Sequence, residues 1–363
     1  LAQLVTQEHA KKFQCHYPMA SEAVLKSTYM DDTMDSKEDD DEAIMLYQQL
    51  KGLWNAAGMH ARKAVLEKIP EDDRAAEVDL EAESLPSVKT LGVTWKAHED
   101  AFTFSSKQKC GAQKVTKRSF LSSIATVFDP LGLLSPFIVQ AKMVLQDIWL
   151  VGSDWDEQLP EEITAKIMNW YEDLQSIQKI LVPRCLRRSS KPTDVTLHFF
   201  CDASILAYAA VAYQRTEHAD GLVTVRMIAA KSKVAPIKAV SIPRLELMGA
   251  VLSVRLAAAI STTLEVDASR IYYWTDSMNV VCWIRQRSRT LKTFVTNRVA
   301  KIQEASKVQQ WRHVGTKLNP ADIASRGTSA IELSTSELWW NGPGFLLESI
   351  DRWPALTTTD DDS

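Results

Sequence analysis

The sequence predicts an α/β protein, α+β overall, whose C-terminal part forms a mixed five-stranded sheet with flanking helices. Three apolar runs of strand length follow one another between residues 195 and 231. From residue 243 onward, helical runs with apolar residues three and four apart alternate with further strand-length runs. Strands joined first by hairpins and then by helix crossovers produce one mixed sheet with helices packed on it.

Length and composition are those of a globular protein with room for two or three domains: 363 residues, 45% hydrophobic and 24% charged. No apolar run approaches the roughly 20 residues that span a bilayer, and the N-terminus is no signal peptide. Five scattered cysteines without a CxxC pair argue against a disulfide scaffold and fit a reducing compartment. We therefore expect an intracellular protein, cytoplasmic or nuclear, that is not secreted. The first residue is Leu rather than Met, which indicates a fragment or a processed segment.

Charge is distributed unevenly along the chain, although the net charge is only −4. Residues 36–84 carry 13 acidic and 6 basic side chains, whereas residues 280–326 carry 10 basic and 2 acidic ones. The basic stretch is suited to follow a phosphate backbone, or it forms an ordinary solvated helix face.

The N-terminal half of the chain predicts a strand, several helices and a hairpin. Apolar residues recur at near-helical spacing between Ile44 and Trp54, and Gly58 is a suitable end for that helix. In chain order we expect a strand at 27–30 with a turn at 31–32, a helix at 41–59, an acidic loop at 67–87, a hairpin at 88–104, helices on either side of a Pro/Gly break at 129–136, a helix at 160–181 and a basic linker at 183–193.

The C-terminal half supplies the sheet. The expected elements are strands at 195–202, 207–215 and 222–231, a helix at 243–264, a strand at 270–275, helices at 277–286 and 292–305, a strand at 308–314 and a short helix from Asn319.

Four carboxylates lie at the edges of these elements: Asp202, Glu246, Asp276 and Asp322. Asp202 and Asp276 end the first strand and the strand after the long helix, which tend to be central neighbours in such a sheet. Glu246 lies one turn into the helix that crosses the sheet, and a C-terminal helix brings Asp322. An all-oxygen cluster repels itself unless cations fill it. The pattern therefore predicts a site for two divalent metal ions, which clamp the attacking and leaving oxygens of a phosphodiester.

Each carboxylate also has a structural interpretation. Asp276 is a candidate N-cap for the following helix, and Asp322 a favourable charge in a first helical turn. Glu246 is able to form a surface pair with Arg244. Asp202 is harder to explain in this way, because it follows an apolar strand where the sheet core should end. One site shared by the four carboxylates is favoured over four separate structural roles.

Four short blocks resemble the active-site blocks of a ribonuclease H domain, in the same order along the chain. The blocks are Cys201-Asp-Ala-Ser204, Arg244-Leu-Glu246, Trp274-Thr-Asp-Ser277 and Asn319-Pro-Ala-Asp-Ile-Ala-Ser-Arg326. The sequences of these blocks most resemble those of LTR retrotransposon polyproteins of the Bel/Pao type, and the resemblance covers residues 195–327. It implies a ribonuclease H-like sheet and hydrolysis of the RNA strand of RNA–DNA hybrids.

The resemblance also implies roles for particular residues. The four carboxylates named above would be both the catalytic residues and the ligands of two Mg²⁺ or Mn²⁺ ions. Ser204, Asn279 and Arg326 are candidates for contacts to the nucleic-acid strands. His313 is a candidate for the mobile histidine found before the last aspartate in many such enzymes, or it is an ordinary strand residue.

The upstream half resembles the end of a reverse transcriptase from the same polyproteins. Tyr29-Met-Asp-Asp32 is similar to the YxDD block, Leu91-Gly-Val-Thr-Trp95 to the primer grip, and Phe128–Pro136 to the connecting segment. Asp31 and Asp32 would be a polymerase remnant. Only 28 residues precede Tyr29, too few for the fingers and the further metal-binding aspartate, so we expect no DNA synthesis by this chain alone.

The implied organisation is a partial reverse-transcriptase palm at 1–110, a helical thumb, connection and linker at 111–190, a ribonuclease H-like domain at 191–330 and a C-terminal tail at 331–363. The implied partners are an RNA–DNA hybrid and the remainder of the polyprotein, in the cytoplasm (as a virus-like particle) or the nucleus, and no membrane. The sequence does not indicate an oligomeric state.

Two other functions stay open from the sequence. One is a non-catalytic remnant of a decayed element that binds nucleic acid or protein without turnover. The other is the aspartic peptidase that Bel/Pao polyproteins carry. Peptidase chemistry needs an Asp-Thr/Ser-Gly turn, and the nearest match, Thr275-Asp-Ser-Met278, lacks the glycine.

Overall fold

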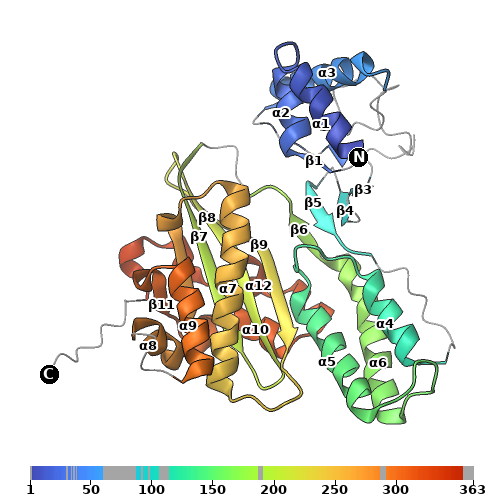
Figure 1. Cartoon of the computed structure of the whole chain (residues 1–363), viewed down its shortest axis with the longest axis vertical. Coiled ribbons are helices and arrows are strands. Elements are labelled where there is room, and N and C mark those ends of the chain that lie inside the picture. Colours follow the sequence, from blue (N-terminus) through green and yellow to red (C-terminus); the bar gives the residue numbers. More distant parts are fainter. Residues whose placement is uncertain are drawn as a thin grey trace. The chain divides into compact units, whose positions relative to one another are not determined.

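The computed structural model of the chain describes residues 2–29, 32, 33, 35, 37, 39–59, 87–90, 93–96, 99–105, 114–186, 191–286 and 292–354. These residues fall into two compact units (Figure 1). Unit 1 contains Leu1–Thr103 and Pro183–Cys185, and unit 2 contains Phe104–Val182 and Leu186–Ser363. Each unit is described by itself below.

Three helices form the small core of unit 1: α1 (Ala2–Lys12), α2 (Pro18–Lys26) and α3 (Asp40–Ala56). They bury Ala10, Ala20, Val24 and Leu53 against one another. The carboxylate of Asp39 caps α3 by accepting a hydrogen bond from the Glu42 backbone N–H. The helix predicted at 41–59 is confirmed as α3, whereas α1 and α2 were not predicted from the sequence.

Short antiparallel strands make up the rest of unit 1. β1 (Thr28–Tyr29) pairs with β2 (Asp32–Thr33), with Tyr29 opposite Asp32. The hairpin predicted at 88–104 is confirmed as β4 (Val93–Lys96) and β5 (Ala101–Thr103), and β3 (Ser87–Thr90) adds a third strand. Asp100 turns this hairpin with a φ of 46°. The loop predicted at 67–87 lies outside the described residues except for Ser87, and so does Asp31.

Unit 2 begins with three helices, α4 (Lys117–Thr126), α5 (Ser135–Val151) and α6 (Glu161–Leu174). β6 (Leu181–Pro183) follows, and its last residue, Pro183, belongs to unit 1. The helices confirm the predictions on both sides of the Pro/Gly break and at 160–181, where a 3-10 turn continues α6 to Lys179. Their contact is aromatic: the Phe137 ring stacks on Trp170 with centroids 5.0 Å apart, and Phe120 meets Trp170 edge-on at 5.7 Å.

A mixed five-stranded sheet in the order β11-β10-β7-β8-β9 forms the centre of unit 2 (Figure 1). The strands are β7 (Pro192–Ala203), β8 (Ala207–His218), β9 (Val223–Val234), β10 (Ile271–Thr275) and β11 (Trp311–His313). β7, β8 and β9 form an antiparallel meander, whereas β10 runs parallel to β7 and β11 parallel to β10. The predicted fold class is confirmed, and β7 and β10 are central neighbours as expected.

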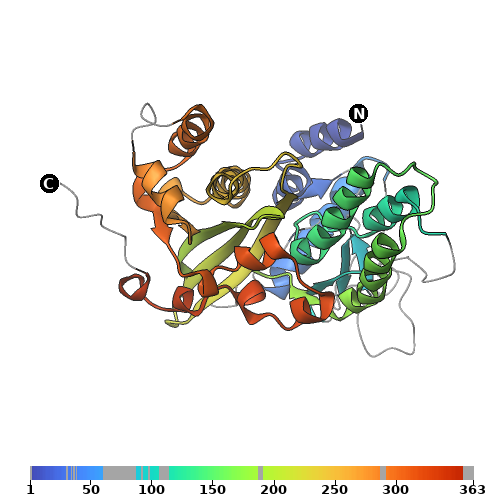
Figure 2. The same cartoon turned by 90° about the horizontal axis from the view of Figure 1, so that it is seen from below.

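Helices cover both faces of this sheet (Figure 2). On one side lies α7 (Ile242–Leu264), followed along the chain by α8 (Met278–Arg285) and α9 (Thr293–Ala305). α7 is long and apolar enough to cross a membrane by length and composition, but half of the tested window is buried inside the protein. Its buried residues, among them Leu247, Ala250 and Val254, pack against Phe199 and Trp311 of the sheet in one core cluster. Its apolar character is therefore that of a core helix.

The opposite side carries the C-terminal segment, where we had expected a tail from residue 331. The segment forms α10 (Ala321–Arg326), α11 (Ala330–Ser334), α12 (Glu337–Asn341) and 3-10 turns at Gly344–Leu347 and Ile350–Arg352. Tryptophans anchor the segment as far as residue 354: Trp339 is 0% and Trp353 6% exposed. Arg215 of β8 adds hydrogen bonds from Nε to the Leu346 carbonyl (2.6 Å) and from Nη2 to the Glu348 carbonyl (3.1 Å).

The break between α4 and α5 joins the helices to the edge of the sheet. The Asp129 carboxylate accepts hydrogen bonds from the backbone N–H groups of Leu133 (2.9 Å) and Leu134 (2.8 Å). The Leu131 carbonyl accepts from the Ala230 N–H of β9 at 2.8 Å. Gly132 has a φ of 72°, and a Cβ there would lie 1.9 Å from the Ala230 carbonyl oxygen. Only glycine fits that position. The boundaries predicted at 110/111, 190/191 and 330/331 stay predictions; α4–α6, the sheet and the C-terminal segment share one compact unit.

Candidate active site

Asp202 and Asp276 emerge side by side at the carboxyl ends of two neighbouring parallel strands. The register of β7 and β10 places Cys201 opposite Thr275, so the next residue of each strand is an aspartate. Asp202 is buried, at 6% exposure, and Asp276 is half-buried. The convergence expected from the order of the elements is therefore present in the backbone.

A close approach of α7 to β7 positions Glu246. A Cβ on Gly249 would lie 3.0 Å from the Asp202 carbonyl oxygen and 3.4 Å from that of Ala209, so α7 lies nearly against the end of the strand. Glu246 is one turn earlier on the same helix. Its Oε2 accepts a hydrogen bond of 2.5 Å from the Ser277 hydroxyl, which directly follows Asp276.

The block around α10 contributes Asp322 together with two residues that fix the aspartates. Asn319 is buried, and its Nδ2 donates to the Cys201 carbonyl (3.0 Å) and to Asp276 Oδ1 (3.2 Å). The Ser325 hydroxyl donates to Asp202 Oδ2. The fourth carboxylate, Asp322, accepts a hydrogen bond of 2.6 Å from Arg326 Nε.

The electrostatics show that these carboxylates act on one another. Burial raises the pKa of Asp202 to about 7, and the charges of Asp276 and Asp322 add to this, against the Ser325 hydrogen bond. Burial also raises the pKa of Glu246, with a further contribution from Asp276, while the hydrogen bond from Ser277 opposes it. The four carboxylates thus share one field of negative charge that a cation would relieve.

The donor set fits hard divalent cations, since it consists of carboxylate oxygens. The side chains do not form a gathered metal site as they stand. Across the described ranges, no group of three or more His, Cys, Asp or Glu side chains is arranged to hold a metal ion. Each carboxylate instead bonds a neighbouring serine, asparagine or arginine.

Two structural interpretations of the carboxylates are wrong. The N-cap of α8 is Ser277, whose hydroxyl accepts from the Val280 N–H, rather than Asp276. Glu246 bonds Ser277, whereas the Arg244 guanidinium lies over the Phe294 ring, 5.1 Å from its centroid. Asp322 does lie in the first turn of α10, as its structural interpretation required.

The remaining predicted residues lie around this centre. Ser204 donates its hydroxyl to the Ser325 carbonyl at 2.7 Å and accepts from the Leu206 N–H at 3.1 Å, so it joins the β7–β8 turn to α10. Asn279 is exposed at the start of α8, and Arg326 is exposed beside Asp322. His313 is a half-buried residue of β11, with Nε2 3.2 Å from the Asp276 carbonyl oxygen.

The polymerase-like residues are described only in part. Asp32 begins β2, opposite Tyr29, and Asp31 lies outside the described residues. The resemblance of this hairpin to the YxDD block therefore stays a prediction.

Sequence reasoning missed the residues that hold the carboxylates in place: Gly249, Ser277, Asn319 and Ser325. Three of them stand inside the blocks quoted above for the resemblance, so their position in a block was the available signal. Gly249 carried a weaker signal, as a glycine inside an otherwise strongly helical run.

A family model described as a Pao retrotransposon-like RNaseH-like domain matches residues 116–277. The chain carries a Pao-type, ribonuclease H-like domain. The resemblance to Bel/Pao polyproteins is thereby confirmed. The match begins at the cap of α4 and ends at Ser277, so it includes α4–α6 as well as Asp202, Glu246 and Asp276.

Among curated proteins no match is found. Solved structures with similarity include the N-terminal RNase H domain of a Mycobacterium tuberculosis protein, fused to maltose binding protein (15% identity, 36% of this chain and 94% of that chain, TM-score 0.25). RNase H1 from Halobacterium salinarum matches at 14% identity over 35% of this chain and 89% of that one, with a TM-score of 0.24. The foamy viral protease-reverse transcriptase in complex with dsDNA matches at 12% identity over 63% of this chain and 44% of that one, with a TM-score of 0.21.

Proposed function

We propose that the Pao-type domain is a nuclease that hydrolyses the RNA strand of RNA–DNA hybrids with the help of two divalent cations. The observation that carries the proposal is the placement of Asp202 and Asp276 at adjacent ends of parallel strands, within a field shared with Glu246 and Asp322. A carboxylate whose pKa is raised by burial and by neighbouring charges is typical of a functional site, since such an arrangement costs folding free energy.

The four carboxylates would hold the cations, Mg²⁺ or Mn²⁺. When bound, two such ions supply a clamp for the attacking and leaving oxygens of an in-line displacement. The protein's own contribution is to fix the carboxylates. Asn319 and Ser325 restrain Asp276 and Asp202, and Ser277 restrains Glu246. Asn279 and Arg326 are exposed beside this centre and are proposed to contact the strands.

Recognition of RNA would use the 2′-hydroxyls that a wide minor groove displays. His313 is not proposed as a catalytic residue, since its Nε2 lies by the Asp276 carbonyl and its place in β11 fixes its backbone. Ser204 is not proposed as a strand contact either, because its hydroxyl is engaged in the β7–β8 turn.

The test is cleavage of a labelled RNA–DNA hybrid by the full chain, with and without Mg²⁺. Asp276→Asn should lower the rate at least 100-fold, on the order of the loss when a positioned catalytic group is removed. Asp194→Asn is the matched control, because Asp194 is an aspartate of the same strand β7 at its opposite end, paired with Arg270. Cleavage that survives Asp276→Asn, or that needs no divalent cation, would overturn the proposal. Binding of the hybrid without any cleavage would favour the non-catalytic alternative.

A further inference from the structure

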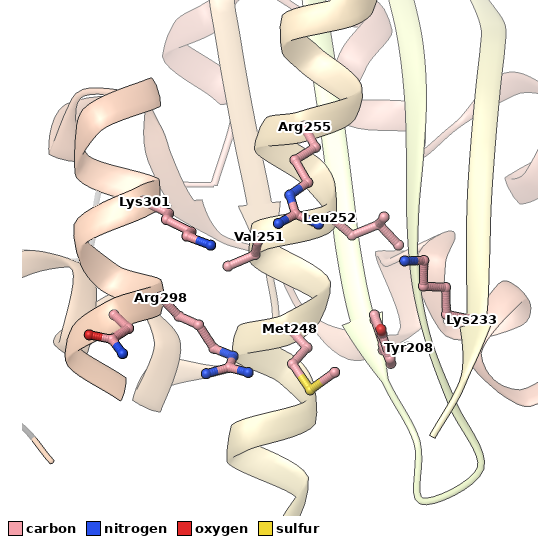
Figure 3. Close-up of a pocket in the computed structure, with 9 residues that line it drawn as sticks. Tyr208, Lys233, Met248, Val251, Leu252, Arg255, Arg298 and Lys301 are labelled. Carbon is pink, nitrogen blue, oxygen red and sulfur yellow. The ribbon is translucent and has the colours of Figure 1, made fainter. Parts of the chain in front are cut away.

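A cavity of about 260 Å³ lies outside the carboxylate cluster, against α7 and α9 and the adjoining ends of β8 and β9. Met248, Val251 and Leu252 of α7 give it an apolar floor. We call it the basic groove, after the side chains that surround this floor: Tyr208 of β8, Lys233 of β9, Arg255 of α7, and Arg298 and Lys301 of α9 (Figure 3).

The groove concentrates positive charge. Of the described residues that line it, four are cationic and none carries a carboxylate. The ion pairs found among the described residues include none of these four cations. In Figure 3 the side chains of Arg298 and Lys301 extend from α9 toward α7, and Arg255 extends toward them. Like charges gathered in this way repel one another, so an anion bound among them would be stabilised.

Aromatic contacts fix part of this charge in place. The Arg298 guanidinium lies 3.4 Å from the centroid of Phe294 and donates from Nη1 to the Phe294 carbonyl at 3.0 Å. Burial lowers the pKa of Arg298, and the charge of Arg244 contributes to this shift. Burial raises the pKa of Tyr208, opposed by the charges of Arg255 and Arg298. The phenol and the guanidiniums therefore face the same space.

The groove is close to the carboxylates along the chain but lies on another face of α7, because residues two apart on a helix do not share a face. Tyr208 is paired with Ala203, the residue after Asp202, and Met248 is two residues after Glu246. From Glu246 to Arg255 is nine residues of α7, which is about 13.5 Å at a helical rise of 1.5 Å per residue. Nine residues are also 2.5 helical turns, so the side chains of Glu246 and Arg255 leave α7 on opposite sides.

We propose that the basic groove binds backbone phosphates of a nucleic-acid strand. Arginine and lysine on three separate elements match a row of singly charged phosphates, and the apolar floor offers a surface for the sugars between them. The identity of the strand, as part of an RNA–DNA hybrid, rests on the proposed function.

The test is binding of a fluorescent 16-base-pair RNA–DNA hybrid to the full chain, measured by anisotropy in EDTA so that no turnover occurs. The variant is Arg255→Gln/Lys301→Gln. If each cation neutralises one phosphate, the slope of log K against log salt falls by about 2 in magnitude. Between about 50 and 200 mM salt the wild type would then lose roughly 12-fold more affinity than the variant.

Two further variants make the result interpretable. Arg255→Lys/Lys301→Arg keeps both charges and should restore the wild-type salt slope, which a purely structural role in packing would not predict. Lys191→Gln removes one exposed lysine just before β7, at the end of that strand opposite Asp202, and should leave the slope nearly unchanged.

An unchanged slope of log K against log salt in the Arg255→Gln/Lys301→Gln variant overturns the inference. The inference is also overturned if a polyglutamate chain binds as tightly as the hybrid and its binding depends on Arg255 and Lys301 in the same way. The second result would indicate an acidic peptide as the occupant. Groove-dependent hybrid binding by a chain that cleaves nothing would refute the proposed function alone. Cleavage by a chain whose binding ignores the groove would refute this inference alone.

Discussion

Replacing Asp202 by asparagine removes a buried negative charge and keeps the shape of the side chain. Asp202 has a pKa of about 7 in the folded protein, because burial and the charges of Asp276 and Asp322 disfavour its ionised form. In the unfolded chain an aspartate has its ordinary pKa of about 3.9. As the pH rises from 4 to 7, the unfolded chain therefore loses the proton of this group first, and the folded state becomes less stable relative to it.

The magnitude follows from the size of the shift. A difference of about 3 pKa units corresponds to about 4 kcal/mol of unfolding free energy. Part of that value comes from charges shared with neighbouring carboxylates, so about 2–4 kcal/mol is expected for Asp202 itself. We predict that Asp202→Asn raises the free energy of unfolding by this amount at pH 8 in EDTA and has little effect at pH 4. The same variant should have lost its hybrid cleavage.

The assay is urea denaturation followed by tryptophan fluorescence at both pH values. Of the 11 tryptophans, only Trp54 and Trp95 lie in unit 1, so the signal reports mainly on unit 2. Asp194→Asn serves as the control, since Asp194 pairs with Arg270 at 3.2 Å near the surface and its loss should change stability little or unfavourably. Equal stability of Asp202→Asn and the wild type at pH 8 would contradict this prediction, because the ionised Asp202 would then not destabilise the folded protein.

Three further predictions concern the cation, the approach of α7 and the C-terminal segment. Mg²⁺ at about 100 times its Kd should stabilise the wild type at pH 8 by about 2.7 kcal/mol; an equal gain in Asp202→Asn would show that the cation binds elsewhere. Gly249→Val places carbon atoms against the Asp202 carbonyl, so hybrid cleavage should fall about 100-fold, as for a displacement of about 1 Å. Circular dichroism should show that the helices are retained, and full activity would contradict the close packing of α7 on β7. Trp353→Ala removes ring contacts to His198 and Tyr272. The free energy of unfolding in urea should fall by about 3–5 kcal/mol, and the cleavage rate of the folded protein should stay unchanged. A decrease below about 1 kcal/mol would indicate a loosely held C-terminal segment.

The sheet and its carboxylates could be predicted because their signals are local. Each strand is a run of apolar residues, and each carboxylate marks the end of such a run or the first turn of a helix. The order of the elements then restricts the topology, since a helix crossover returns the chain to a parallel neighbour. Asp202 and Asp276 meet because the crossover through α7 carries the chain from β9 back to the free side of β7.

The C-terminal segment was not predicted because its order depends on contacts far apart in the chain. Trp339 Nε1 donates to the Leu133 carbonyl at 3.0 Å, and Arg215 Nε to the Leu346 carbonyl at 2.6 Å. No local periodicity records such partners. Short helical turns of three to five residues have no extended pattern to detect.

The residues that hold the carboxylates were missed for a related reason. Ser277 and Ser325 are common residue types in positions with ordinary local roles, at an N-cap and within a short helix. Their importance appears only when Glu246 and Asp202 are brought to them by other elements. Gly249 is similar, because its role is set by the distance between α7 and β7.

The central claim, that Asp202, Glu246, Asp276 and Asp322 form a two-cation nuclease site, is tested most directly by the chemical ends of the cleaved strand. A hybrid labelled on both strands is incubated with the full chain in Mg²⁺ under single-turnover conditions. Because the leaving group is the 3′ oxygen, we expect cuts in the RNA strand alone, with 3′-hydroxyl and 5′-phosphate ends. We also expect at least 100-fold slower cleavage by Asp276→Asn. Cyclic phosphate ends, cuts in the DNA strand, or equal rates for the wild type and the variant would contradict it.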